Sequence, residues 1–146
     1  MKRGSAQFSP VLTIAIAQLF GTSLWFSANS AADDLVRTWG LTAANIGTLT
    51  AAVQAGFILG TMAFALLGLA DRFSASRIFG LAALLGAGFN AWFACLSGDF
   101  SAAIALRFAV GVCLAGIYPI GMKLIISWAP DRAGAALALL VGMLTL

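Results

Sequence analysis

Long apolar stretches alternate with short polar ones along the whole sequence. The apolar stretches reach about 20 residues or more, which is the length of α-helix needed to cross the hydrocarbon core of a bilayer. This pattern predicts an all-α integral membrane protein with four complete transmembrane helices, over residues 10–29, 43–70, 78–96 and 102–128. A fifth stretch, residues 133–146, is too short to span a bilayer, so we expect one transmembrane domain that is truncated within its fifth helix.

Composition supports a membrane protein and argues against most other classes. The chain is 62% hydrophobic and 9% charged, whereas soluble domains carry about 25% charged residues. The net charge of +3 comes from few and scattered basic residues, so we expect no nucleic-acid partner. Lys2 and Arg3 before an apolar run also resemble a signal peptide, but the run is long and further spans follow it. We interpret it as a helix that is retained.

Catalytic and metal-binding residues are scarce. The sequence has no histidine, which is the commonest metal ligand and general base. It has no paired carboxylates inside the apolar stretches and no serine with an evident base partner. Cys95 and Cys113 both lie in apolar stretches, as small packing residues do. We therefore expect a protein that is not an enzyme and that needs no metal or cofactor.

Positively charged residues concentrate at one end of the predicted helices. Cytoplasmic connections of membrane proteins carry an excess of Lys and Arg. The connections at the far end contain Arg37. Those at the N-terminal end contain Lys2, Arg3, Arg72, Arg77 and Arg132. We expect a cytoplasmic N-terminus and a location in the inner (plasma) membrane of a bacterium.

Polar side chains recur at helical spacing on one face of the first, second and fourth predicted helices. Polar groups inside a bilayer are costly, so such stripes indicate a wet cavity. The residues that we predict to line a substrate or coupling pathway are Gln18, Thr22, Asn29, Gln54, Arg107 and Tyr118. The alternative for Gln18 and Gln54 is interhelical hydrogen bonding that only holds the bundle together. A separate series, Ala52, Gly56 and Gly60, predicts close helix packing.

Arg107 is a candidate site residue with two distinct possible roles. It lies roughly 9 Å inside the fourth helix. One possibility is that its side chain extends to the outer interface. The other is a functional role towards an anionic substrate or a buried carboxylate, although no acidic residue of this chain lies at membrane depth. Lys123, nearer the cytoplasmic end, is interpreted as an interfacial anchor.

Proline and glycine interrupt the fourth predicted helix. Pro119 removes one backbone hydrogen bond, and Gly116 and Gly121 flank it. These three residues are a candidate hinge, and a static kink is the alternative.

Three segments resemble motifs of the major facilitator superfamily, in the order that the family has. The loop LADRFSASR, Leu69–Arg77, is similar to G-x-L-A-D-R-x-G-R-R and keeps its L-A-D-R core. Ser74 replaces the second glycine of that motif, and Ala75 and Ser76 replace its basic pair. RFAVGVCLA, which begins at Arg107, is similar to R-x-x-Q-G-x-G-x-A, and the later PDRAGAA is similar to P-E-R-x-G-x-A.

The resemblance implies two six-helix halves that rock around a central site. It also implies that the loop is a conformational latch formed by Asp71, Arg72 and Arg77, and that Arg107 takes part in coupling or substrate handling. The leading hypothesis is the N-terminal part of a secondary active transporter that moves a small solute, an anion if Arg107 binds it. Its partners would be the lipid bilayer and a missing C-terminal half. The alternative is a small four- or five-helix structural or assembly subunit.

Overall fold

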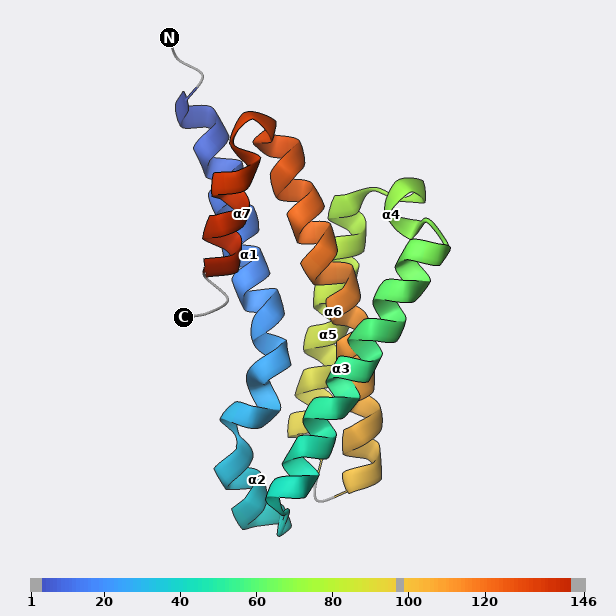
Figure 1. The fold of residues 1–146 in the computed structure, drawn as a ribbon. Coiled ribbons are helices and arrows are strands. Elements are labelled where there is room, and N and C mark those ends of the chain that lie inside the picture. Colours follow the sequence, from blue (N-terminus) through green and yellow to red (C-terminus); the bar gives the residue numbers. More distant parts are fainter. Residues whose placement is uncertain (1–3, 97–98, 143–146) are drawn as a thin grey trace.

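The computed structural model of the protein describes residues 4–96 and 99–142, and Figure 1 shows them as a bundle of long helices. No strand occurs in these residues. The elements are α1 (Gly4–Ser30), α2 (Ala32–Trp39), α3 (Ala43–Leu66), α4 (Leu69–Arg72), α5 (Ala75–Ala94), α6 (Phe100–Trp128), the 3-10 helix η1 (Pro130–Arg132) and α7 (Ala133–Gly142). Among the described residues, α1, α3, α5 and α6 are long and apolar enough to cross a membrane. The prediction of four spans is confirmed.

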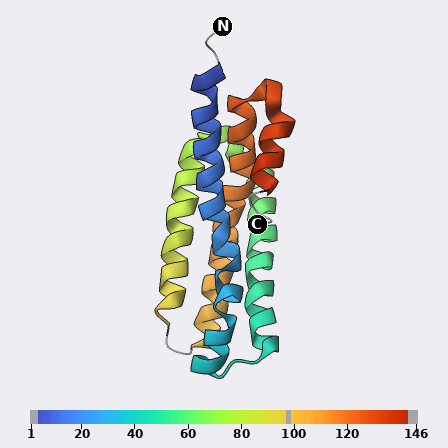
Figure 2. The ribbon, with the colours of Figure 1, turned by 90° about the vertical axis from the view of Figure 1, so that its left-hand side faces the viewer.

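Helix α6 lies at the centre of the bundle, and α1, α3 and α5 pack around it (Figures 1 and 2). More than half of its membrane span is buried, against a third or less of each of the other spans. The outer helices instead expose large apolar side chains such as Phe20, Leu66 and Leu84. In a bilayer those side chains contact lipid, so only the central helix is enclosed on most sides.

Glycines allow α3 and α6 to approach closely. A Cβ on Gly56 would meet the carbonyl oxygen of Phe108, and one on Gly111 would meet that of Val53. A Cβ on Gly60 would lie 2.9 Å from Cβ of Ala115. The predicted close packing at Gly56 and Gly60 is confirmed, because backbone now lies where a side chain would be.

The polar connection after the first span is a helix rather than a loop. Helix α2 has Asp33 and Asp34 in its first turn and Arg37 in its last, which suits the helix dipole. Leu35 is buried against the bundle, and Gly40 ends the helix with a φ of 65°. The alternation of apolar and polar stretches did not reveal this helix, because dense charges obscure its amphipathic pattern.

The second span is shorter than predicted. Helix α3 ends at Leu66, not at residue 70, because Gly68 adopts a left-handed conformation with a φ of 61°. Residues 69–72 then form the separate short helix α4, which turns the LADR segment away from the span. Helix α5 begins at Ala75, earlier than the predicted residue 78.

Other helix ends also differ from the predicted ones. Helix α1 starts at Gly4 and contains Pro10 within it. Helix α6 starts at Phe100, and the Asp99 carboxylate accepts a hydrogen bond from the amide of Ala102 at 3.0 Å, which caps that end. Helix α7 covers the start of the predicted fifth helix, and residues 143–146 lie outside the described residues.

Candidate functional site

Arg107 points into the bundle from the first third of α6. The residue is only 1% exposed. Its Nη1 donates a hydrogen bond to the carbonyl oxygen of Leu24 at 3.1 Å, and its Nη2 donates to that of Trp25 at 2.8 Å. Each carbonyl oxygen has two lone pairs, so it can accept from Arg107 as well as from its own helix. Arg107 does not extend to the membrane surface, and that alternative is wrong.

Two further polar side chains complete the cluster around Arg107. Nη1 also donates to Ser27 Oγ at 2.9 Å and to Asn90 Oδ1 at 3.2 Å. The Ser27 hydroxyl donates to the same Asn90 oxygen at 2.6 Å. The ring of Phe93 lies beside the guanidinium, with its centroid 5.7 Å from Cζ. One cation therefore connects α1, α5 and α6.

The Arg107 cluster contains no carboxylate. In the part of the chain that the structure describes, both ion pairs lie elsewhere. Sequence reasoning missed Ser27 and Asn90. The available signal was that Asn90 is a polar residue inside the apolar third span, where it must find a partner.

Gln18 and Thr22 lie one above the other on α1. Both are buried, and the Thr22 hydroxyl donates to the Gln18 carbonyl at 2.7 Å. The Gln18 amide packs against Gly121, yet neither of its polar atoms has a hydrogen-bond partner among the described residues. The predicted alternative of interhelical hydrogen bonding is therefore not seen for Gln18.

Asn29 and Gln54 lie on exposed surface. Asn29 Oδ1 accepts a hydrogen bond from the Thr50 hydroxyl at 2.8 Å, which connects α1 to α3. Gln54 is exposed on α3. The described residues contain no cluster of three or more side chains that could hold a metal ion.

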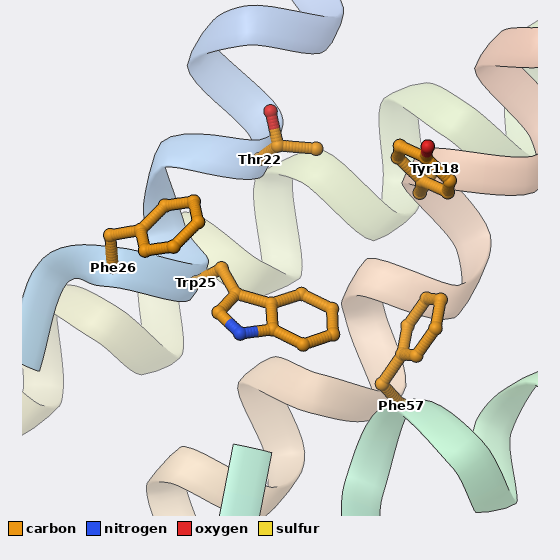
Figure 3. Close-up of a pocket in the computed structure, with 5 residues that line it drawn as sticks. All are labelled: Thr22, Trp25, Phe26, Phe57 and Tyr118. Carbon is orange, nitrogen blue, oxygen red and sulfur yellow. The ribbon is translucent and has the colours of Figure 1, made fainter. Parts of the chain in front are cut away.

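A small pocket opens between α1, α3 and α6, with a volume of about 210 Å³ (Figure 3). Its lining residues are Thr22, Trp25, Phe26, Phe57 and Tyr118. The structure thus brings Thr22 and Tyr118, two of the predicted pathway residues, to one pocket together with three aromatic residues. Arg107, Gln18, Asn29 and Gln54 do not line this pocket.

Trp25 connects the pocket to the Arg107 cluster. Its indole forms one wall of the pocket, whereas its carbonyl oxygen accepts the hydrogen bond from Arg107 Nη2. The Arg107 side chain therefore contacts the backbone of α1 behind that wall and does not line the pocket itself.

The LADR segment makes one ion pair. The Asp71 carboxylate lies 2.8 Å from Lys123 Nζ on α6, and the same ammonium donates to the Ala70 carbonyl at 2.7 Å. Arg72 and Arg77 are exposed and form no ion pair with the described residues. Sequence reasoning interpreted Lys123 as an interfacial anchor and missed its pairing with Asp71, because nothing in its local sequence connects it to a loop 52 residues away.

The Major Facilitator Superfamily model matches residues 14–146, nearly the whole chain. The chain belongs to the major facilitator superfamily. The resemblance of the three segments is therefore confirmed, and this superfamily is one of membrane transporters. No curated protein and no solved structure matches the chain.

In this superfamily member the motif aspartate is held ionised by Lys123. Hydrogen bonding and charge attraction from Lys123 lower the pKa of Asp71 below its ordinary value. The ion pair between Asp71 and Lys123 is therefore fully formed above the ordinary carboxyl pKa, and it is lost as the pH falls through the lowered pKa of Asp71. We expect the Asp71 carboxyl carbon to titrate, in NMR, below the ordinary pKa of an aspartate, and Lys123→Met to move its midpoint upward. A midpoint that Lys123→Met leaves unchanged would contradict the pairing.

The three hinge candidates of this transporter lie inside one continuous helix, α6. A Cβ on Gly116 would lie 2.7 Å from Cβ of Ala82, and one on Gly121 would meet the Gln18 amide. Close packing therefore explains why glycine fits at both positions, in addition to any role in bending. Pro119 interrupts the hydrogen bonding of α6 between them.

Proposed function

We propose that this chain is the N-terminal part of a secondary active transporter that moves a small solute by alternating access. Such a protein has a second half opposite the first and a solute site between them. The observation that carries the proposal is the pocket of Thr22, Trp25, Phe26, Phe57 and Tyr118, which three spans of a superfamily member build together. Transport, rather than catalysis, is the activity of such a site.

In this proposal the polar residues of α1, α3 and α6 have three kinds of role: contacting the solute, lining its pathway and positioning a helix. Thr22 and Tyr118 contact the solute at the pocket. Gln18, Asn29 and Gln54 line the rest of the pathway, and Gly116, Pro119 and Gly121 allow α6 to bend. Arg107 is a positioning residue, because its hydrogen bonds go to α1 and α5 and none to the pocket.

We infer the orientation in the membrane from the distribution of basic residues. Figure 1 shows the N-terminal end, α4 and the connection between α6 and α7 at the same end of the bundle. Arg72, Arg77 and Arg132 belong to that end. An excess of basic residues favours the cytoplasm, so we place the N-terminus there, in a bacterial inner membrane.

We assign the latch to the same cytoplasmic end. The Asp71 side chain is 84% exposed even while it is paired with Lys123. A group on the second half can therefore reach it, with Arg72 and Arg77 beside it. The ion pair holds α4 on α6 in the state seen here, and its release or exchange would accompany the change of access.

Thiol labelling from each side of the membrane tests alternating access without knowledge of the solute. We expect Thr22→Cys, in a transporter that includes its second half and lacks Cys95 and Cys113, to react with an impermeant reagent from both sides. The controls are Ser76→Cys and Ser101→Cys, which lie at opposite ends of the bundle and should each react from one side. Labelling of the Thr22→Cys thiol from one side alone would instead favour the assembly-subunit alternative.

The same experiment tests the latch. Asp71→Asn should raise labelling of the Thr22→Cys thiol from the cytoplasmic side, because the bond that holds α4 on α6 is weakened. Asp131→Asn is the matched control, because Asp131 is an exposed acid at the same end that forms no ion pair with the described residues. An unchanged ratio would reject the latch and leave the transport proposal in place.

A further inference from the structure

We infer that the solute presents an uncharged aromatic ring to the pocket between α1, α3 and α6. The inference rests on the proposed transport function and narrows it to a substrate class. Its basis is the shape and chemistry of the pocket wall, together with the position of the Arg107 guanidinium behind that wall.

The pocket wall is a continuous set of aromatic rings. Trp25 and Phe57 are in edge contact, with centroids 5.0 Å apart and planes at 63°. Phe57 and Tyr118 are in edge contact at 6.5 Å and 74°. Helices α1, α3 and α6 each contribute one of these rings. Aromatic groups prefer such offset and edge-to-face arrangements, so a further planar ring fits the set.

The polar atom of Thr22 is turned away from the space between the rings. Its hydroxyl donates to the Gln18 carbonyl at 2.7 Å within α1. Figure 3 shows its methyl group towards Tyr118 and its hydroxyl oxygen pointing elsewhere. The pocket therefore presents a methyl group and ring faces to a solute, and few places to hydrogen-bond one.

Charge argues against an ionic group in the pocket. None of the five lining residues is ionisable near neutral pH, so a bound anion would lose its hydration without a cationic side chain in the lining to offset the cost. Aromatic faces are themselves electron-rich and repel anions. They would attract a cation, but the Arg107 guanidinium lies directly behind Trp25, bonded to its carbonyl at 2.8 Å. A neutral ring avoids both penalties.

The volume sets the size of the ring system. An apolar protein cavity of about 150 Å³ binds benzene, and this pocket has about 210 Å³. One or two fused rings fit that space. Sites for whole drug-sized ligands are about 300 Å³ or larger, so the remainder of a larger solute would lie outside this pocket.

The test is binding of three naphthalene probes to the chain in lipid nanodiscs, measured by equilibrium dialysis against empty nanodiscs. The probes are 2-naphthylmethanol, 2-naphthoate and 2-naphthylmethyl-trimethylammonium, which share a ring and differ in charge. We expect the alcohol to bind about tenfold tighter than either ion. Trp25→Ala should weaken its binding about tenfold, whereas Trp92→Ala, on the lipid-exposed surface of α5, should not.

A second, milder variant guards against loss of folding. Phe57→Leu keeps an apolar side chain of similar size and removes the ring, and Phe20→Leu makes the same change on the exposed side of α1. We expect weaker binding for the first alone, with helix content by circular dichroism unchanged in both. Equal or tighter binding of either ion, equal effects of paired variants, or no binding of the alcohol would overturn the inference. None of these results depends on the two-sided labelling of the Thr22→Cys thiol, so that experiment tests the transport proposal independently.

Discussion

Arg107→Ala is expected to destabilise the helix bundle by roughly 2–4 kcal/mol, the sum of several interhelical hydrogen bonds inside a membrane. The substitution removes the bonds to the Leu24 and Trp25 carbonyls and to Ser27 and Asn90. The relevant reference is a set of separated helices already in the bilayer, in which Arg107 would face lipid at a cost. Association of the helices therefore relieves that cost, so Arg107 stabilises the bundle and its removal should destabilise it. Unfolding in increasing SDS, followed by tryptophan fluorescence or circular dichroism, measures it.

Arg72→Ala is the matched control for Arg107→Ala. It removes the same side chain from the exposed end of α4, where it has no ion pair with the described residues. We expect little change in stability, since exposed charges contribute little. Arg107→Lys should recover only part of the loss, because one ammonium cannot reproduce the two-pronged contact with neighbouring carbonyls. A wild-type midpoint for Arg107→Ala would show that the cluster is not a stabilising element.

Gly56→Ala is expected to cost about 1–3 kcal/mol, the range for overpacking of a well-packed interior. The added methyl group would meet the carbonyl oxygen of Phe108 on α6. That atom is backbone in the middle of a long helix, so it cannot move aside as a flexible side chain can. The two helices would have to separate along the contact that also contains Gly60 and Gly111. The same SDS titration, together with crosslinking between α3 and α6, measures the loss.

Gly47→Ala gives the matched control on the same helix. A Cβ at Gly47 would meet nothing within 4 Å. Alanine is a better helix former than glycine, so this variant should be neutral or more stable by about 0.5–1 kcal/mol. Equal effects of the two substitutions would mean that helix propensity, rather than contact with α6, governs the response at Gly56.

The helices and the close-packed glycines could be predicted, but the partners of the charged residues could not. Gly56 and Gly60 were identifiable because their spacing puts them on one helix face. The short helix α2 was missed, because a search for apolar stretches long enough to span a bilayer does not detect a helix of eight residues with a narrow apolar face. Lys123 was assigned to the interface, yet it reaches across to Asp71 on another element. Such pairings depend on helix rotation and tilt, which local spacing leaves open.

The amino-acid sequence by itself determined the membrane class, the four spans and the superfamily, because hydrophobic length and motif order are local properties that add along the chain. The tertiary structure alone decided what the Arg107 side chain contacts. Its depth in the helix could be inferred from the sequence, but its enclosure by Leu24, Trp25, Ser27 and Asn90 required three helices to be placed together. It likewise decided that the pocket is aromatic. The polar stripes indicated a wet cavity, whereas packing turned Trp25, Phe57 and Tyr118 towards one another and left the arginine behind them.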